Sequence, residues 1–170
     1  AITHCIGCNQ GCFDHVFYLQ PVTCTLNPRA GRELEFKAEA PAKAKRVAVV
    51  GGGPAGMKAA ITAAERGHAV SLYEKSDVLG GQLNLAAIPP EREEFWTAVE
   101  DLDVQLDDAG VELYLETEAT ADLLAAEGYD AVVVATGGRQ AWLLYPSDAA
   151  DDPPCVALRC RRPHQHHNTP

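Results

Sequence analysis

Four cysteines near the start of the chain are the first residues whose spacing indicates chemistry. Cys5, Cys8, Cys12 and Cys24 are separated by two, three and eleven residues, and the next cysteine is Cys155. Two thiolates spaced Cys-x2-Cys can bind one centre from a single turn, and two further thiolates complete a set of four soft ligands. Such a set suits an iron–sulfur cluster or structural zinc, whereas a disulfide framework is normally spread through a domain.

The spacing of these cysteines leaves both metals open. Structural zinc sites usually pair two Cys-x2-Cys knuckles, whereas three close cysteines and a distant fourth are more typical of a four-iron cluster. The spacing agrees with neither of the common ferredoxin patterns. We therefore favour a four-iron four-sulfur cluster over zinc and predict that all four thiols are its ligands.

A glycine-rich loop is the second chemical motif. Gly51-Gly-Gly53-Pro-Ala-Gly56 directly follows the apolar run 47–50 and directly precedes a predicted helix. In such a loop the first glycine permits a tight turn, the second lets a pyrophosphate approach, and the third lets the helix pack against the strand. N–H groups at the start of the helix bind phosphate oxygens. The pattern therefore predicts a dinucleotide site.

An acidic residue follows where a dinucleotide site binds a ribose. Glu74 ends the next predicted strand, 23 residues after Gly51. Its carboxylate would accept hydrogen bonds from ribose hydroxyls and repel a 2′-phosphate, so FAD, NAD or ADP fits better than NADP. Two later turns, 80–82 and 135–138, favour FAD because glycine there would let the backbone approach a ligand, although each is also ordinary turn chemistry.

The predicted cofactor contacts gather in these three turns and beside Glu74. No catalytic residue is predicted in this chain. The predicted cofactor-binding residues are Gly51, Gly53, Pro54, Ala55, Gly56, Glu74, Lys75, Gly81, Gln82, Ala135, Thr136 and Gly137.

Alternating strands and helices must position these residues. We expect buried strands at 47–50 and 131–135, a strand at 69–73 and a half-buried strand at 111–115. We expect helices from Pro54 to just before Gly67, at 91–109 and at 121–126. In the 91–109 helix, apolar residues at steps of three and four predict one buried face: Phe95, Val99, Leu102, Leu106 and Ala109. The alternation predicts an α/β fold, a partial doubly wound (Rossmann-type) parallel sheet preceded by an irregular four-cysteine loop.

The chain divides into four predicted segments. They are the iron–sulfur loop (1–36), a polar linker (37–45), a partial FAD- or dinucleotide-binding domain (46–141) and a tail (142–170). The tail has no regular period and resembles the translation of a sequencing adapter, so we expect it to be non-native or disordered.

The charge of the chain excludes some partners. A net charge of −10 over 170 residues disfavours nucleic acid and anionic membranes, which attract basic surfaces. No apolar stretch approaches the roughly 20 residues that span a bilayer. We therefore expect a soluble, cytoplasmic protein with no membrane or nucleic-acid partner.

The order of the motifs resembles the 2,4-dienoyl-CoA reductase and trimethylamine dehydrogenase family of NADH:flavin oxidoreductases. The similar stretches are Cys5-Ile-Gly-Cys8-Asn-Gln-Gly-Cys12, Cys24-Thr-Leu-Asn-Pro-Arg-Ala-Gly31, the Gly51 loop and Gly80-Gly-Gln-Leu-Asn-Leu-Ala86. The cysteine spacing is more similar to the dienoyl-CoA reductase branch. The resemblance implies a four-iron four-sulfur cluster on the four cysteines and FAD on the glycine loop.

The resemblance also implies a longer parent enzyme. In that parent, hydride passes from NAD(P)H to FAD, single electrons cross the cluster to FMN, and FMN reduces an activated double bond. The FMN-holding barrel and the NAD(P)H-binding domain are absent from this sequence, so we interpret the chain as an electron-transfer fragment that is inactive alone. The alternative is a non-redox module that binds ADP or FAD and holds structural zinc.

Overall fold

Four parallel strands form the sheet of the protein. The computed structural model describes residues 2–37 and 39–138; residues 1, 38 and 139–170, which include the predicted tail, lie outside the described residues. All but the last of the described residues belong to one unit, which ends at Gly137. The strands are β1 (Arg46–Val50), β2 (Ala69–Tyr73), β3 (Glu112–Tyr114) and β4 (Ala131–Val134), in the order β3-β2-β1-β4. The predicted α/β fold with a parallel sheet is confirmed.

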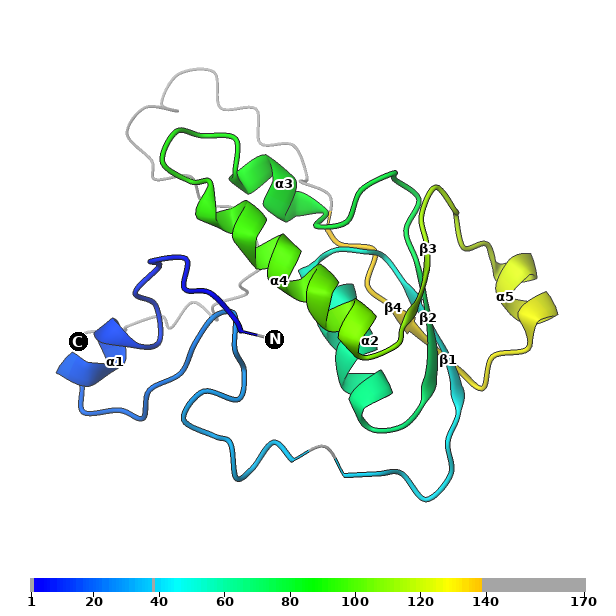
Figure 1. The fold of residues 1–170 in the computed structure, drawn as a ribbon, viewed down its shortest axis with the longest axis horizontal. Coiled ribbons are helices and arrows are strands. Elements are labelled where there is room, and N and C mark those ends of the chain that lie inside the picture. Colours follow the sequence, from blue (N-terminus) through cyan, green and yellow to red (C-terminus); the bar gives the residue numbers. More distant parts are fainter. Residues whose placement is uncertain (1, 38, 139–170) are drawn as a thin grey trace, which may run out of the picture. The chain divides into compact units, whose positions relative to one another are not determined.

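Two helices cover one face of this sheet (Figure 1). They are α2 (Pro54–Glu65) and α4 (Glu94–Asp108), and α5 (Ala121–Glu127) lies on the other side of the sheet. The sequence did not predict two helices of five residues each, α1 (Phe13–Phe17) and α3 (Gln82–Ala86). No helix in the described part of the chain has both the length and the apolar character needed to cross a bilayer.

The core lies between the sheet and the α2–α4 layer. Side chains of β1 and β2 alternate between the two faces, so Val47, Val49, Val70 and Leu72 all point to the same helices. Their partners from the helices are Met57, Ala60, Ile61, Leu102 and Leu106. Burying each of the larger side chains contributes about 1.5–3 kcal/mol to stability. This core fixes the start of α2 against the end of β1.

The buried face of α4 differs from the predicted face. Ala98, Asp101, Leu102 and Leu106 are buried, whereas Phe95, Val99 and Ala109 are half-buried. The buried face of α4 is therefore rotated relative to the predicted one. It includes the acid Asp101, which a search for apolar residues leaves out. The carboxylate of Asp101 is in hydrogen-bond contact with His4, near the start of the described residues.

The burial predicted for β4 is wrong. Val132, Val133 and Val134 are 44%, 37% and 73% exposed. β4 pairs with β1 along one side only, so in the described residues it is an edge strand. A run of apolar residues predicts a strand but does not tell a central strand from an edge strand.

Candidate dinucleotide site and cysteine loop

The glycine loop lies where β1, β2 and β4 end at the same edge of the sheet. The N–H of Gly51 donates to the carbonyl of Tyr73 at 2.8 Å, and the N–H of Ala135 donates to the carbonyl of Val50 at 2.8 Å. These bonds continue the strand ladders past their ends. The carboxyl edge of a parallel sheet is the usual place for a bound dinucleotide.

Two positions in the loop leave no room for a side chain. Gly51 has φ +113°, and a β-carbon there would overlap the carbonyl oxygen of Ala135. A β-carbon at Gly56 would overlap the carbonyl oxygen of Gly51, because α2 starts directly against the turn. The first and third glycines of the motif therefore have the steric roles expected from the sequence.

The second glycine of the motif faces open space. Gly53 is the N-cap residue of α2, with φ −75° and ψ 174°, and a β-carbon there would meet no heavy atom of the described residues within 4 Å, apart from its chain neighbours. Pro54 and Ala55, which open the helix, are exposed. Gly81 crosses close by, since its β-carbon would lie 3.2 Å from the α-carbon of Gly53. The N–H groups and positive dipole end of α2 thus meet a gap suited to a pyrophosphate.

Glu74 is joined directly to the glycine loop. Its Oε2 accepts a hydrogen bond from the N–H of Gly52 at 2.6 Å. Its Oε1 accepts from the N–H and the hydroxyl of Ser76 at 2.9 and 2.8 Å. A carboxylate offers about four acceptor positions, so a ribose hydroxyl would use the remaining one or replace a present donor. Ser76 was not predicted; the signal in the sequence was a serine two residues after the acid.

The environment of Glu74 favours its ionised form. Burial raises the pKa of this carboxyl, but the N–H groups of Ser76 and Gly52 and the hydroxyl of Ser76 together lower it more. The positive charge of the adjacent Lys75 acts in the same direction. The net result is a pKa below the ordinary value. Glu74 is therefore a charged acceptor at the end of β2.

The two later turns lie beside the same loop. The N–H of Gly80 donates to the carbonyl of Gly52 at 2.9 Å, which brings the exposed Gln82, at the start of α3, next to the glycine loop. Thr136 and Gly137 are exposed directly after β4. The structure thus gathers the predicted cofactor-binding residues along one edge of the sheet. Their contacts with a cofactor remain predictions.

A separate groove lies between α4 and β3. The groove has a volume of about 450 Å³, and its lining contains no residue of the glycine loop, although a β-carbon at Gly52 would meet Leu79, which lines it. The lining residues are Asp77, Val78, Leu79, Trp96, Val99, Glu100, Asp103, Leu113 and Leu115. We assign the dinucleotide site to the sheet edge instead, because backbone N–H groups and the charged Glu74 converge there.

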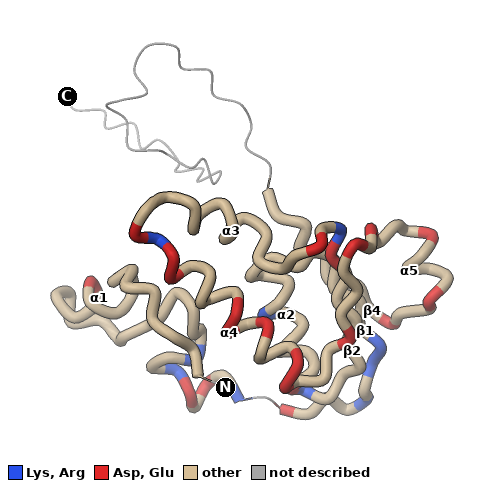
Figure 2. The backbone as a smooth tube through the Cα atoms, turned by 45° about the horizontal axis from the view of Figure 1, so that its top comes forward, with Lys and Arg blue, Asp and Glu red and all other residues tan. Residues whose placement is uncertain are grey.

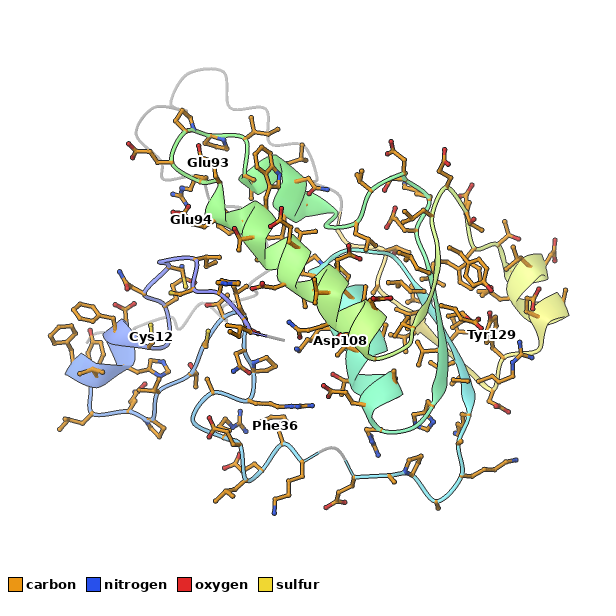
Figure 3. The ribbon with its side chains drawn as sticks, in the orientation of Figure 1. Cys12, Phe36, Glu93, Glu94, Asp108 and Tyr129 are labelled. Carbon is orange, nitrogen blue, oxygen red and sulfur yellow. The ribbon has the colours of Figure 1, made fainter. Side chains whose placement is uncertain are left out.

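The cysteine loop is described around all four predicted ligands. All four are free thiols; Cys5 and Cys24 are exposed, and Cys8 and Cys12 are half-buried. Cys12 directly precedes α1 (Figure 3). Within the described ranges, no three His, Cys, Asp or Glu side chains are grouped so that they could hold a metal ion. The structure therefore does not bring the four thiols together, and the ligand set remains a prediction.

The chemistry of these thiols nevertheless suits a metal. The hydroxyl of Thr25 and the N–H of Gln10 lower the pKa of the Cys8 thiol. The N–H of Gly7 donates to the sulfur of Cys5 at 3.3 Å. The lowered pKa of Cys8 favours its thiolate, which is the form that binds metals. The donor types fit a thiolate-bound metal, and their arrangement in this structure does not.

Comparisons with known proteins agree with the fold and the motifs. Residues 45–160 match the family described as pyridine nucleotide-disulphide oxidoreductase. The chain is 46% identical over 140 residues to a metal reductase of Desulforamulus reducens and 48% identical over 139 residues to an NADH oxidase of Thermoanaerobacter brockii. Each alignment covers 80% of this chain and 21% of the relative.

A solved structure extends the comparison to three dimensions. A 2-naphthoyl-CoA reductase in complex with 2-naphthoyl-CoA superimposes with a TM-score of 0.77 at 42% identity. The superposition covers 82% of this chain and 22% of the reductase. The chain therefore spans about a fifth of the length of the proteins it matches.

Proposed function

The chain belongs to the pyridine nucleotide-disulphide oxidoreductase family, and on this premise we propose that it is the FAD-binding part of a larger NAD(P)H-dependent flavin oxidoreductase. The resemblance to NADH:flavin oxidoreductases that the motifs predicted is confirmed, since an NADH oxidase and a CoA-ester reductase are among its relatives. The proposed parent carries FMN and an NAD(P)H-binding domain in the parts that this sequence does not contain.

One observation supports the proposal most strongly. The N–H groups at the start of α2 and the ionised Glu74 lie at the same sheet edge, and Gly52 joins them. The N–H groups match a pyrophosphate, and the carboxylate matches the hydroxyls of an adenosine ribose. The same chemistry accepts ADP, which is the smallest ligand we propose for this site.

We extend the proposal to the cysteine loop. Four free thiols on Cys5, Cys8, Cys12 and Cys24, with the pKa of Cys8 lowered, support these cysteines as the ligands of a four-iron four-sulfur cluster. Iron and acid-labile sulfide, measured after anaerobic reconstitution of the chain, are the test. About four irons bound to the wild type and fewer to Cys8→Ser would support the cluster. One zinc and no sulfide would support structural zinc instead.

The proposed FAD site is tested by replacing Gly53 with alanine. Because a β-carbon at Gly53 would contact none of the described residues beyond its chain neighbours within 4 Å, the unliganded variant should melt at the temperature of the wild type. The methyl group would fill the gap beside the α2 N-terminus, so we expect FAD and ADP affinity to fall at least tenfold. Titration calorimetry measures both ligands. Unchanged affinity for both in a normally folded variant would contradict the site.

Two further statements belong to the same proposal. The free thiols of the four cysteines support a reducing, cytoplasmic location. Turnover requires the barrel and the NAD(P)H-binding domain, so this chain alone is proposed to bind cofactor without completing a reaction.

A further inference from the structure

Asp101 is a buried acid whose partner lies in the cysteine loop. It is 9% exposed and belongs to the buried face of α4, among Ala98, Leu102 and Leu106. A buried carboxylate is costly unless hydrogen bonds satisfy it. Figure 2 shows several acidic residues along α4, and Asp101 is the one whose burial needs an explanation.

His4 makes two hydrogen-bond contacts with the carboxylate of Asp101. Its N–H donates to Oδ2 of Asp101 at 2.6 Å, and its ring Nδ1 lies 2.7 Å from Oδ1. The pair joins positions that are 97 residues apart in the sequence. His4 immediately precedes Cys5, so this contact fixes the backbone next to the first predicted ligand.

A second contact attaches the later part of the loop. The guanidinium of Arg29 pairs with the carboxylate of Glu65, at the end of α2. The pKa of Lys58, on the same helix, is below its ordinary value. Burial is the main cause, and the positive charge of Arg29 acts in the same direction, whereas the charge of Glu65 opposes it. Arg29 therefore lies close enough to α2 to affect a second side chain there. The two attachment points, Glu65 and Asp101, are acids on the helical layer that covers the sheet.

We propose that Asp101 and Glu65 are two acidic attachment points that hold the cysteine loop on the dinucleotide-binding domain, with Asp101 positioning His4 and hence Cys5. The acid at position 101 interrupts the apolar face of α4 because it serves the loop rather than the core. This inference does not depend on the metal, since the contacts are formed by residues beside the thiols.

Hydrogen exchange of the full chain, followed by mass spectrometry, tests the proposal. Peptides covering residues 2–12 report on the loop, and peptides covering 46–60 report on β1 and α2. In Asp101→Ala we expect exchange in 2–12 to be about tenfold to a hundredfold faster, because both hydrogen bonds between His4 and Asp101 are lost. Exchange in 46–60 should be unchanged, because alanine is a good helix former.

Variants of His4 keep the test independent of the stability of α4. His4→Ala removes only the ring contact and should accelerate exchange in 2–12 by a smaller factor than Asp101→Ala. His4→Asn places an amide donor at similar reach and should restore slow exchange. Asp103→Ala, two residues along the same helix and exposed, is the matched control and should behave as the wild type.

Three results would overturn the proposal. The first is equal acceleration in 2–12 and 46–60 in Asp101→Ala, which would make Asp101 a residue of the domain core. The second is unchanged exchange in both Asp101→Ala and His4→Ala. The third is an effect of Asp103→Ala as large as that of Asp101→Ala.

Discussion

Glu74 supplies the negative charge of the proposed FAD site. Glu74→Gln keeps the shape of the side chain and removes the charge that accepts ribose hydroxyls. A hydrogen bond to a charged group contributes about 1.5–3 kcal/mol, so we expect FAD affinity to fall about tenfold to a hundredfold. Flavin fluorescence during titration measures this. Glu100→Gln, exposed on α4, is the control, and an equal loss in both variants would contradict the role of Glu74.

The same carboxylate makes folding stability depend on pH. Burial raises the pKa of Glu74, but hydrogen bonds from Ser76 and Gly52 bring it below the ordinary value of 4.5. Because the folded-state pKa is the lower one, this contribution is complete above the ordinary value and is lost as the pH falls through the folded-state pKa. Melts from about pH 6 to about pH 3 should show the wild type losing stability more steeply than Glu74→Gln. Parallel curves would contradict this.

The residues of the dinucleotide site were predictable because their roles depend on local spacing. Gly51, Gly56 and Glu74 follow predicted strands at fixed distances, and the structure places them at one edge. The contact of His4 with Asp101 was not predictable, because it joins distant segments through the path of an irregular loop. The convergence of the four cysteines was predicted from spacing and is not seen in the described residues.

Among the elements, the turn from β1 into α2 tolerates the least change. A β-carbon at Gly56 would overlap the carbonyl of Gly51, which is backbone and cannot move aside cheaply. We expect Gly56→Ala to destabilise the chain by about 3 kcal/mol, in line with overpacked cores. Chemical unfolding measures this. Gly53→Ala in the same turn is the matched control, and equal stability of the two variants would contradict the tight packing.

The bounds of the elements followed the sequence wherever local signals were strong. β2 occupies the predicted residues 69–73, and Pro54 begins α2 as expected. α4 begins at Glu94 rather than at residue 91, because Glu91 has φ +63° and belongs to the turn that follows Pro89 and Pro90. The two short helices, α1 and α3, span too few residues to show a helical period.

At the scale of the whole molecule, β4 has one unpaired edge within the described residues. Val134 is 73% exposed on this edge strand, and an exposed apolar edge pairs readily with other chains. We expect concentration-dependent self-association of the wild type, measured by sedimentation velocity. Val134→Lys should reduce it, because a charge on an edge strand opposes pairing. Val104→Lys, at an exposed valine on α4, should leave it unchanged. Equal effects of the two lysines would place the association elsewhere.

The position of β1 in the middle of the sheet has a consequence for synthesis on the ribosome. One neighbour, β2, begins at Ala69, soon after β1, whereas the other, β4, ends at Val134. At about 5–20 residues per second, β1 waits several seconds for its second neighbour. During this interval its free side presents unpaired N–H and carbonyl groups, which bind other extended chains. A nascent chain that stalls before residue 131 is therefore more prone to aggregate than one released after β4 has paired.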